Sequence, residues 1–228
     1  AQLAQELRLP AFQWYTPLWA ATEAVLAGHY DDAARLADQA EESGQRAGDR
    51  NAELFANMVR FCARIQREVF HESDFDFVAD KIANSPAGIS YRGSCAWILA
   101  GLGETEKARD ELRTAMTLRL PFDANWLSFQ TECAEAAVLI DDTTYATTLY
   151  ERLSPYAGRP ATSGRAVASY GAIDRHLGAL AEVLGRKNDA IHHLQNAIRL
   201  NTVLGCTVWS AHAERHLSRI AAAGPLAN

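Results

Sequence analysis

Several features that mark common functional classes are missing or scarce in this chain of 228 residues. It has no apolar run as long as a membrane span, and its 7 prolines and 14 glycines are too few for a low-complexity or collagen-like chain. Basic residues are also scarce, since 22 Lys and Arg stand against 28 Asp and Glu, for a formal net charge of −6. Nucleic-acid binders usually carry a basic excess, so we expect no direct nucleic-acid partner, and no membrane partner either.

Cysteines are few and widely spaced, at Cys62, Cys95, Cys133 and Cys206, with no C-x-x-C pair among them. The first three lie among apolar residues at helical spacing, where a thiol behaves as a small hydrophobe. We interpret them as reduced core residues of a cytoplasmic protein. The polar segment 1–8 does not have the pattern of a signal peptide, which agrees with that location.

Apolar side chains recur every three or four residues nearly throughout the chain, and convincing alternating segments of strand length are missing. One such stripe is Tyr170, Ile173, Leu177, Leu180 and Leu184. Each stripe predicts one buried helix face, and the short polar breaks between stripes predict antiparallel helical hairpins. We therefore expect an all-α fold with more than roughly 60% helix and no sheet.

Three of these breaks resemble one another. Gly28, Gly103 and Gly185 are each followed by an alanine five residues later, and by a second alanine after seven more. These alanines are Ala33, Ala40, Ala108, Ala115, Ala190 and Ala197. The glycine is expected to end one helix in a left-handed conformation, and the small alanines allow two helices to approach closely. A degenerate copy places Ala146 at the same point, 38 residues after Ala108 and 44 before Ala190.

A unit of about 40 residues that contains two helices is typical of a helical solenoid. We predict one domain over residues 1–228, a right-handed superhelix of about five hairpins with a C-terminal capping helix. The predicted units are residues 11–48, 50–86, 90–120, 123–155 and 164–204, and the cap covers 207–222.

The Gly-x-x-x-x-Ala turn with its second alanine, together with the Leu177-Gly178 pair, resembles the tetratricopeptide repeat. The units here are longer than usual for that family, and the first-helix tryptophan is missing. The unit around residues 51–85 also has no clear turn glycine.

This irregular pattern is closer to the C-terminal repeats of maltose-activator-like, LuxR-type bacterial transcription regulators and of related cyclase- or ATPase-linked proteins. Residues 149–159 and Leu184-Gly185-Arg186 are similar to that region. The resemblance implies a regulatory module of a bacterial signalling or transcription protein. The chain itself has neither a P-loop nor a basic helix-turn-helix, so it would be one part of such a regulator.

Candidate metal and nucleotide sites are weak. His212 and His216 share a helix face at the spacing of zinc ligands, but Ala213 stands where the zinc-protease motif needs glutamate, and the spacing suggests no third ligand. We interpret the pair as the polar face of the cap, and His192-His193 as surface residues. Residues 158–165 only superficially match a phosphate-binding loop, so we predict no metal and no cofactor.

Catalytic patterns are equally weak. Glu132 and Glu135 lie three residues apart and could act as an acid and a base, but such a pair is usually surface charge, and we interpret it so. Asp141 and Asp142 are expected to be turn and cap residues. No nucleophile with a histidine and an acid stands in a recognisable context, so we do not expect an enzyme.

In a solenoid of helical pairs the first helices line one concave groove. The predicted groove set is Tyr15, Leu18, Thr22, Trp97, Thr131, Glu135, Arg175 and Glu182. Trp97 belongs to it because it falls off the apolar stripe of its own helix, whereas Trp126 is expected to seal a gap between repeats. Aromatic and arginine side chains are the types that anchor a bound segment.

Two main functions follow. The first is a non-catalytic interaction module whose groove binds a peptide, a neighbouring domain or a second copy. The second, which the resemblance to maltose-activator-like regulators implies, is a sensor that holds a small-molecule effector in the groove. An enzyme is only a remote third. The loop Pro155–Arg165 is either a mobile element over one rim or a tolerated insertion. A dry aromatic pocket closed by this loop would favour a small effector. A long open groove with spaced polar anchors would favour a peptide.

Overall fold

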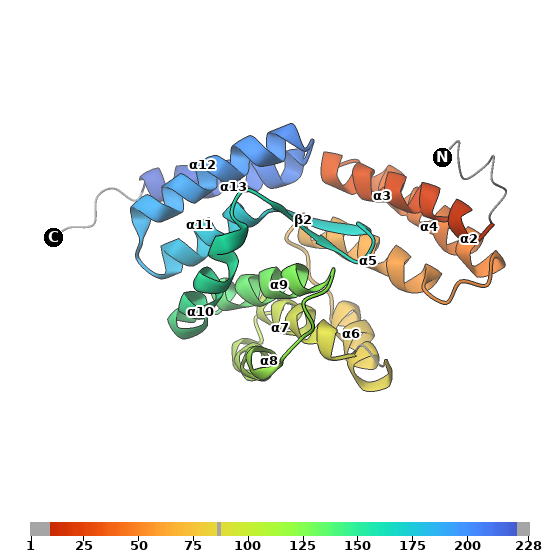
Figure 1. Ribbon diagram of the computed structural model, residues 1–228, viewed down its shortest axis with the longest axis horizontal. Coiled ribbons are helices and arrows are strands. Elements are labelled where there is room, and N and C mark those ends of the chain that lie inside the picture. Colours follow the sequence, from red (N-terminus) through yellow and green to blue (C-terminus); the bar gives the residue numbers. More distant parts are fainter. Residues whose placement is uncertain (1–9, 86–87, 223–228) are drawn as a thin grey trace.

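The computed structural model describes residues 10–85 and 88–222, so the polar segment 1–8 lies outside the described residues. Of the described residues, 76% are helical, which confirms the predicted all-α class (Figure 1). The helices follow one another along the described chain, separated by short breaks. They are α2 (Pro10–Gln13), α3 (Tyr15–Ala27), α4 (Tyr30–Arg46), α5 (Ala52–Ile65), α6 (Glu72–Asn84), α7 (Arg92–Gly101), α8 (Thr105–Thr117), α9 (Trp126–Leu139), α10 (Thr143–Leu153), α11 (Ile173–Val183), α12 (Lys187–Val203) and α13 (Thr207–Ala222), with short 3₁₀ turns η1 (Gly88–Tyr91) and η2 (Ser154–Tyr156).

The local signals at the helix breaks are confirmed. Gly28, Gly103 and Gly185 all have a positive φ, of 82°, 81° and 69°, as expected for glycines that end a helix. The Asp142 side chain caps α10 by accepting a hydrogen bond of 3.0 Å from the backbone N–H of Tyr145. The alanines that follow these breaks are buried where helices meet, with Ala33, Ala108 and Ala190 at most 1% exposed.

One predicted hairpin is open. Helices α3 and α4, α7 and α8, α9 and α10, and α11 and α12 pack along each other, but α5 and α6 do not. Helix α5 packs on α4, and α6 packs on α7. The unit at residues 50–86 therefore contains two helices that belong to different neighbours, and the missing turn glycine in that unit agrees with this difference.

The expected absence of a sheet is wrong. Strands β1 (Pro160–Ser163) and β2 (Ala168–Ala172) form an antiparallel pair, the one sheet in the described part of the chain. Pro160 lies opposite Ala172, and Ser163 lies opposite Ala168. All five residues of β2 are buried, so the strand shows no alternation of polar and apolar residues. The apolar spacing therefore places Tyr170 at the start of a helical stripe, but Tyr170 belongs to β2, and helix α11 begins only at Ile173.

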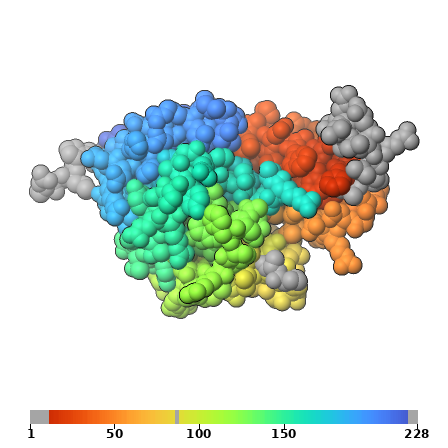
Figure 2. Space-filling model, in the orientation of Figure 1, coloured from red at the N-terminus to blue at the C-terminus, as the bar shows by residue number. Residues whose placement is uncertain are grey.

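The helices surround this β-hairpin. Strand β2 contacts α3, α5, α11, α12 and α13, and β1 contacts α9. Helix α13 also packs on α3, where the Thr207 hydroxyl donates to the carbonyl of Leu26 (3.4 Å). The N-terminal and C-terminal helices therefore meet, with the hairpin between them, and Figure 2 shows it reaching across one face toward the N-terminal helices.

The cysteines lie in the core as predicted, and all four are free thiols. Burial raises the pKa of Cys62 and of Cys95 to about 12, so both thiols are protonated near neutral pH. None of the helices in the described ranges combines the length and the apolar character needed to cross a bilayer.

Candidate functional site

The predicted groove set is mostly buried, and the β-hairpin contacts Tyr15, Thr22 and Trp97. Six of its eight members are less than 10% exposed: Tyr15, Leu18, Thr22, Trp97, Thr131 and Arg175. Glu135 and Glu182 are partly exposed, with 15% and 37% of their side chains accessible. An open groove along these residues is therefore absent from the described structure.

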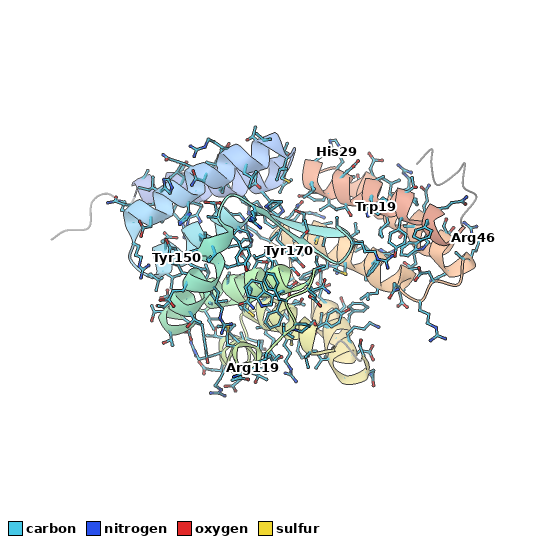
Figure 3. All side chains as sticks on the ribbon, viewed as in Figure 1. Trp19, His29, Arg46, Arg119, Tyr150 and Tyr170 are labelled. Atoms are coloured by element: carbon cyan, nitrogen blue, oxygen red, sulfur yellow. The ribbon has the colours of Figure 1, made fainter. Side chains whose placement is uncertain are left out.

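The tip of the hairpin is pinned to the N-terminal helices by specific hydrogen bonds. The Trp19 indole donates to the carbonyl of Arg165 (3.0 Å), and the Thr22 hydroxyl donates to that of Val167 (2.9 Å). The Arg165 guanidinium donates to the Tyr15 hydroxyl (3.1 Å). Figure 3 shows Trp19 on the N-terminal helices and Tyr170 near the centre of the molecule. The segment that we interpreted as either a mobile element or an insertion is thus strand β1 and an anchored turn.

Trp97 illustrates how the hairpin changes the predicted groove. Its ring lies 5.8 Å from that of Tyr170 and 5.9 Å from that of Phe61, both edge to face. Because β2 brings Tyr170 onto it, Trp97 is only 4% exposed. The prediction that it faces an open groove is wrong, since sequence spacing could not show that a distant strand covers this position.

Arg175 is likewise held inside the protein. Its guanidinium pairs with Glu135 (2.8 Å) and lies over the Trp209 ring at 4.4 Å. Burial opposes ionisation of Glu135, but the charge of Arg175 prevails and holds the pKa of that carboxyl at about 2. Glu135 therefore forms an ion pair that joins α9 to α11, and the prediction that it is surface charge is wrong.

A cavity of about 640 Å³ lies where α5 and α6 separate. Helices α7 and α9, the turn η1 and the tip of the hairpin close it. Its aromatic lining consists of Phe55, Phe61, Phe77, Tyr91 and Tyr170. Its polar lining includes Arg64, Asp74, Ser94, Asn125, Ser128, Glu132 and Arg165. This size and this mixture of aromatic walls with a few polar groups are typical of small-molecule sites.

Glu132 is the most unusual side chain in this pocket. It is only 5% exposed, and its carboxylate accepts hydrogen bonds from the Ser94 hydroxyl (2.8 Å) and the Tyr170 hydroxyl (2.7 Å). Burial raises the pKa of Glu132 to about 7, although these hydroxyl donors act in the opposite direction. The prediction that Glu132 is surface charge fails because α9 has no solvated face there: every residue from Ser128 to Ala134 is buried.

The remaining charges of the pocket are Arg64, Asp74 and Arg165. Arg64 on α5 forms an ion pair with Asp74 on α6, and this pair joins the two separated helices across the pocket wall. The N–H of Gly164 donates to the side-chain oxygen of Asn125 (2.8 Å), which fixes the hairpin tip beside α9. Arg165 is exposed and lies at the rim of the pocket.

The histidines do not form a metal centre. His212 Nε2 lies 2.8 Å from the carbonyl of Gln66, and His216 Nε2 lies 2.5 Å from Glu182, so the two rings have separate partners. The described residues contain no group of three or more His, Cys, Asp or Glu that could hold a metal ion. His192 is exposed as expected, but His193 lies against Asp174 at 3.0 Å and is not a surface residue.

Comparison of the chain with protein-family models, with curated proteins and with solved structures finds no match. The resemblance to tetratricopeptide repeats and to bacterial regulators therefore rests on the sequence pattern alone. The function is best argued from the pocket itself.

Proposed function

We propose that this protein is a non-catalytic helical domain that senses a small organic molecule in the pocket between α5 and α6. The observation that carries this proposal is the cavity of about 640 Å³, with five aromatic side chains in its wall and the hairpin tip closing one side. Residues 163–165 of the Pro155–Arg165 segment line this pocket, which supports an effector site over a peptide groove. The alternative, an open peptide groove, is disfavoured because the hairpin fills its position.

The elements around the pocket suggest how a bound molecule would alter the protein. Helices α5 and α6 do not pack on each other, and a ligand between them would contact both. The hairpin tip lines the same pocket and is anchored to α3 through Arg165 and Trp19. A ligand that prefers one spacing of these elements would stabilise that spacing, so occupancy of the pocket would bias the position of the N-terminal helices.

The sequence resemblance supports a regulatory role. In this proposal the helical pairs are tetratricopeptide-like repeats of a right-handed superhelix, as in the C-terminal regions of maltose-activator-like bacterial regulators. The protein would then act in the cytoplasm as the effector-sensing part of a signalling or transcription regulator.

A protein partner is the second candidate function, and a specific surface favours it. Phe122 is 74% exposed, and its ring lies 5.2 Å from that of Trp126 and 6.3 Å from that of Tyr156. Exposed aromatic clusters often mark protein-interaction sites. A partner peptide, domain or second copy would therefore dock on this cluster rather than in the covered groove.

A ligand screen with a pocket variant tests the effector proposal. A thermal-shift screen of chemically diverse metabolites should yield molecules that bind the protein, with affinities then measured by titration calorimetry. Leu54→Trp should weaken these ligands at least tenfold because Leu54 lines the pocket, whereas Glu53→Trp, at an exposed position on the same helix, should not. Ligands that bind both variants equally well would place the binding site elsewhere and contradict the proposal.

A further inference from the structure

The Glu132 carboxyl group is buried, and when it ionises it becomes a negative charge without a counter-charge. Its hydrogen-bond donors are the hydroxyls of Ser94 and Tyr170, which orient the carboxylate but carry no positive charge. Among the described residues, no Lys, Arg or His forms an ion pair with it. Glu135, one turn further along α9, shows the contrast, since it is paired with Arg175. Burying a carboxylate without such a partner is costly, so a cation brought into the pocket would find a favourable site there.

The other charges of the pocket do not compete for this role. Asp74 already has its partner in Arg64, so that pair presents no net charge to a ligand. The Arg165 guanidinium lies against the Tyr15 ring and donates to its hydroxyl, on the rim of the pocket. Of the two carboxylates in the lining, only Glu132 is left to attract a positive group.

Aromatic rings complete the surroundings of that position. Tyr170 reaches Glu132 through its hydroxyl, and Phe61 and Tyr91 line the same pocket. Faces of aromatic rings attract cations, and the attraction is strongest where water is excluded. The rest of the lining includes Leu54 and Met58, which suit an apolar body.

We propose, building on the effector function proposed above, that the pocket binds an amphipathic organic amine whose protonated nitrogen pairs with Glu132. The apolar part of the ligand would lie along α5, against Leu54 and Met58. A neutral or anionic molecule of the same shape would leave Glu132 without a counter-charge and would bind more weakly.

This ligand class implies a dependence of affinity on pH. The groups that interact with Glu132 are Cys62 on α5, Tyr91 in η1, Ser94 on α7, Cys133 on α9 and Tyr170 on β2. Arg64 lines the same pocket but is paired with Asp74. Burial raises the pKa of both tyrosines above 10 and the pKa of Cys62 to about 12, so these groups do not titrate near neutral pH. The ionised fraction of Glu132 should therefore rise about tenfold between pH 6 and pH 8, and the affinity for an amine should rise with it.

Three probes with one apolar body test the charge preference in the full chain: 3-phenylpropylamine, 3-phenylpropanol and 3-phenylpropanoate. Titration calorimetry or ligand-observed NMR at pH 7.5 should show the amine binding at least tenfold more tightly than the alcohol, and the carboxylate more weakly still. Glu132→Gln should remove the preference for the amine. Glu23→Gln, at an exposed position on α3, should retain it.

The outcomes separate this inference from the proposed function. Equal binding of amine and alcohol, an amine preference that survives Glu132→Gln, or no binding of any probe would overturn the amine proposal. The effector function would fail separately, if the broad metabolite screen also found no ligand that is sensitive to Leu54→Trp. If Glu132→Gln does not fold, the unmodified protein still tests the proposal. Amine binding that is no tighter than alcohol binding, or that does not strengthen between pH 6 and pH 8, would overturn it.

Discussion

Replacement of Glu132 by glutamine should stabilise the protein at alkaline pH. Glutamine has nearly the same shape, and its side-chain oxygen can still accept a hydrogen bond from Ser94 or Tyr170, but it carries no charge. In the unmodified protein the buried carboxyl must ionise without a counter-charge as the pH rises. The variant avoids that cost.

The size of the effect follows from the shift in the pKa of Glu132, from 4.5 to about 7. Between these values the folded state holds more protons than the unfolded state, so the free energy of unfolding falls as the pH rises, and it levels off above pH 7. At about 1.4 kcal/mol per pKa unit, the loss between pH 5 and pH 8 is about 2 to 3 kcal/mol. The low pKa of Glu135 does not contribute to this loss, because Glu135 changes the free energy of unfolding only at pH values below about 4.5.

Urea denaturation at several pH values between 5 and 8 measures this effect. The difference in free energy of unfolding between Glu132→Gln and the unmodified protein should grow in favour of the variant by about 2 to 3 kcal/mol across that range. The other titratable groups are common to both proteins, and their contributions cancel in the difference. Glu23→Gln should follow the unmodified protein, and parallel curves for Glu132→Gln as well would refute the reasoning.

Three further predictions follow from packing and composition. Ala33→Leu should overpack the contact between α3 and α4 and cost about 1–3 kcal/mol in urea denaturation, whereas Ala34→Leu, exposed on the same helix, should change stability by less than about 0.5 kcal/mol. Gly171 and Gly158 have nearly the same positive φ, 76° and 77°. A Cβ added at Gly171 would lie 2.8 Å from the Trp209 ring, whereas a Cβ added at Gly158 would meet no described atom within 4 Å. Gly171→Ala should therefore destabilise the protein by at least about 1 kcal/mol more than Gly158→Ala, and equal thermal shifts would contradict this packing. The purified protein should contain no stoichiometric zinc by elemental analysis, because the described residues contain no group of three ligands for it. It should not bind duplex DNA tightly in a mobility-shift assay, because its net charge is −6.

The helices of this protein, unlike its two strands, were predictable from its sequence. The period of the apolar residues predicts the helices, and the glycines at 28, 103 and 185 predict where three of them end. The alanines that follow predict close helix contacts, and Asp142 predicts a cap. These features depend on neighbours a few residues away along the chain, and such neighbours are visible in a sequence.

Tertiary structure alone decided the pocket and its charge. The separation of α5 from α6, the cover over Trp97 and the burial of Glu132 all depend on residues far away along the chain. Tyr170, for example, meets Glu132 across 38 positions, and it does so from a strand that is buried on both faces and therefore shows no alternating pattern. The sequence shows that Glu132 and Glu135 share one helix face. Only the fold determines that one of them has a cation beside it and the other does not, and that difference sets their opposite pKa shifts.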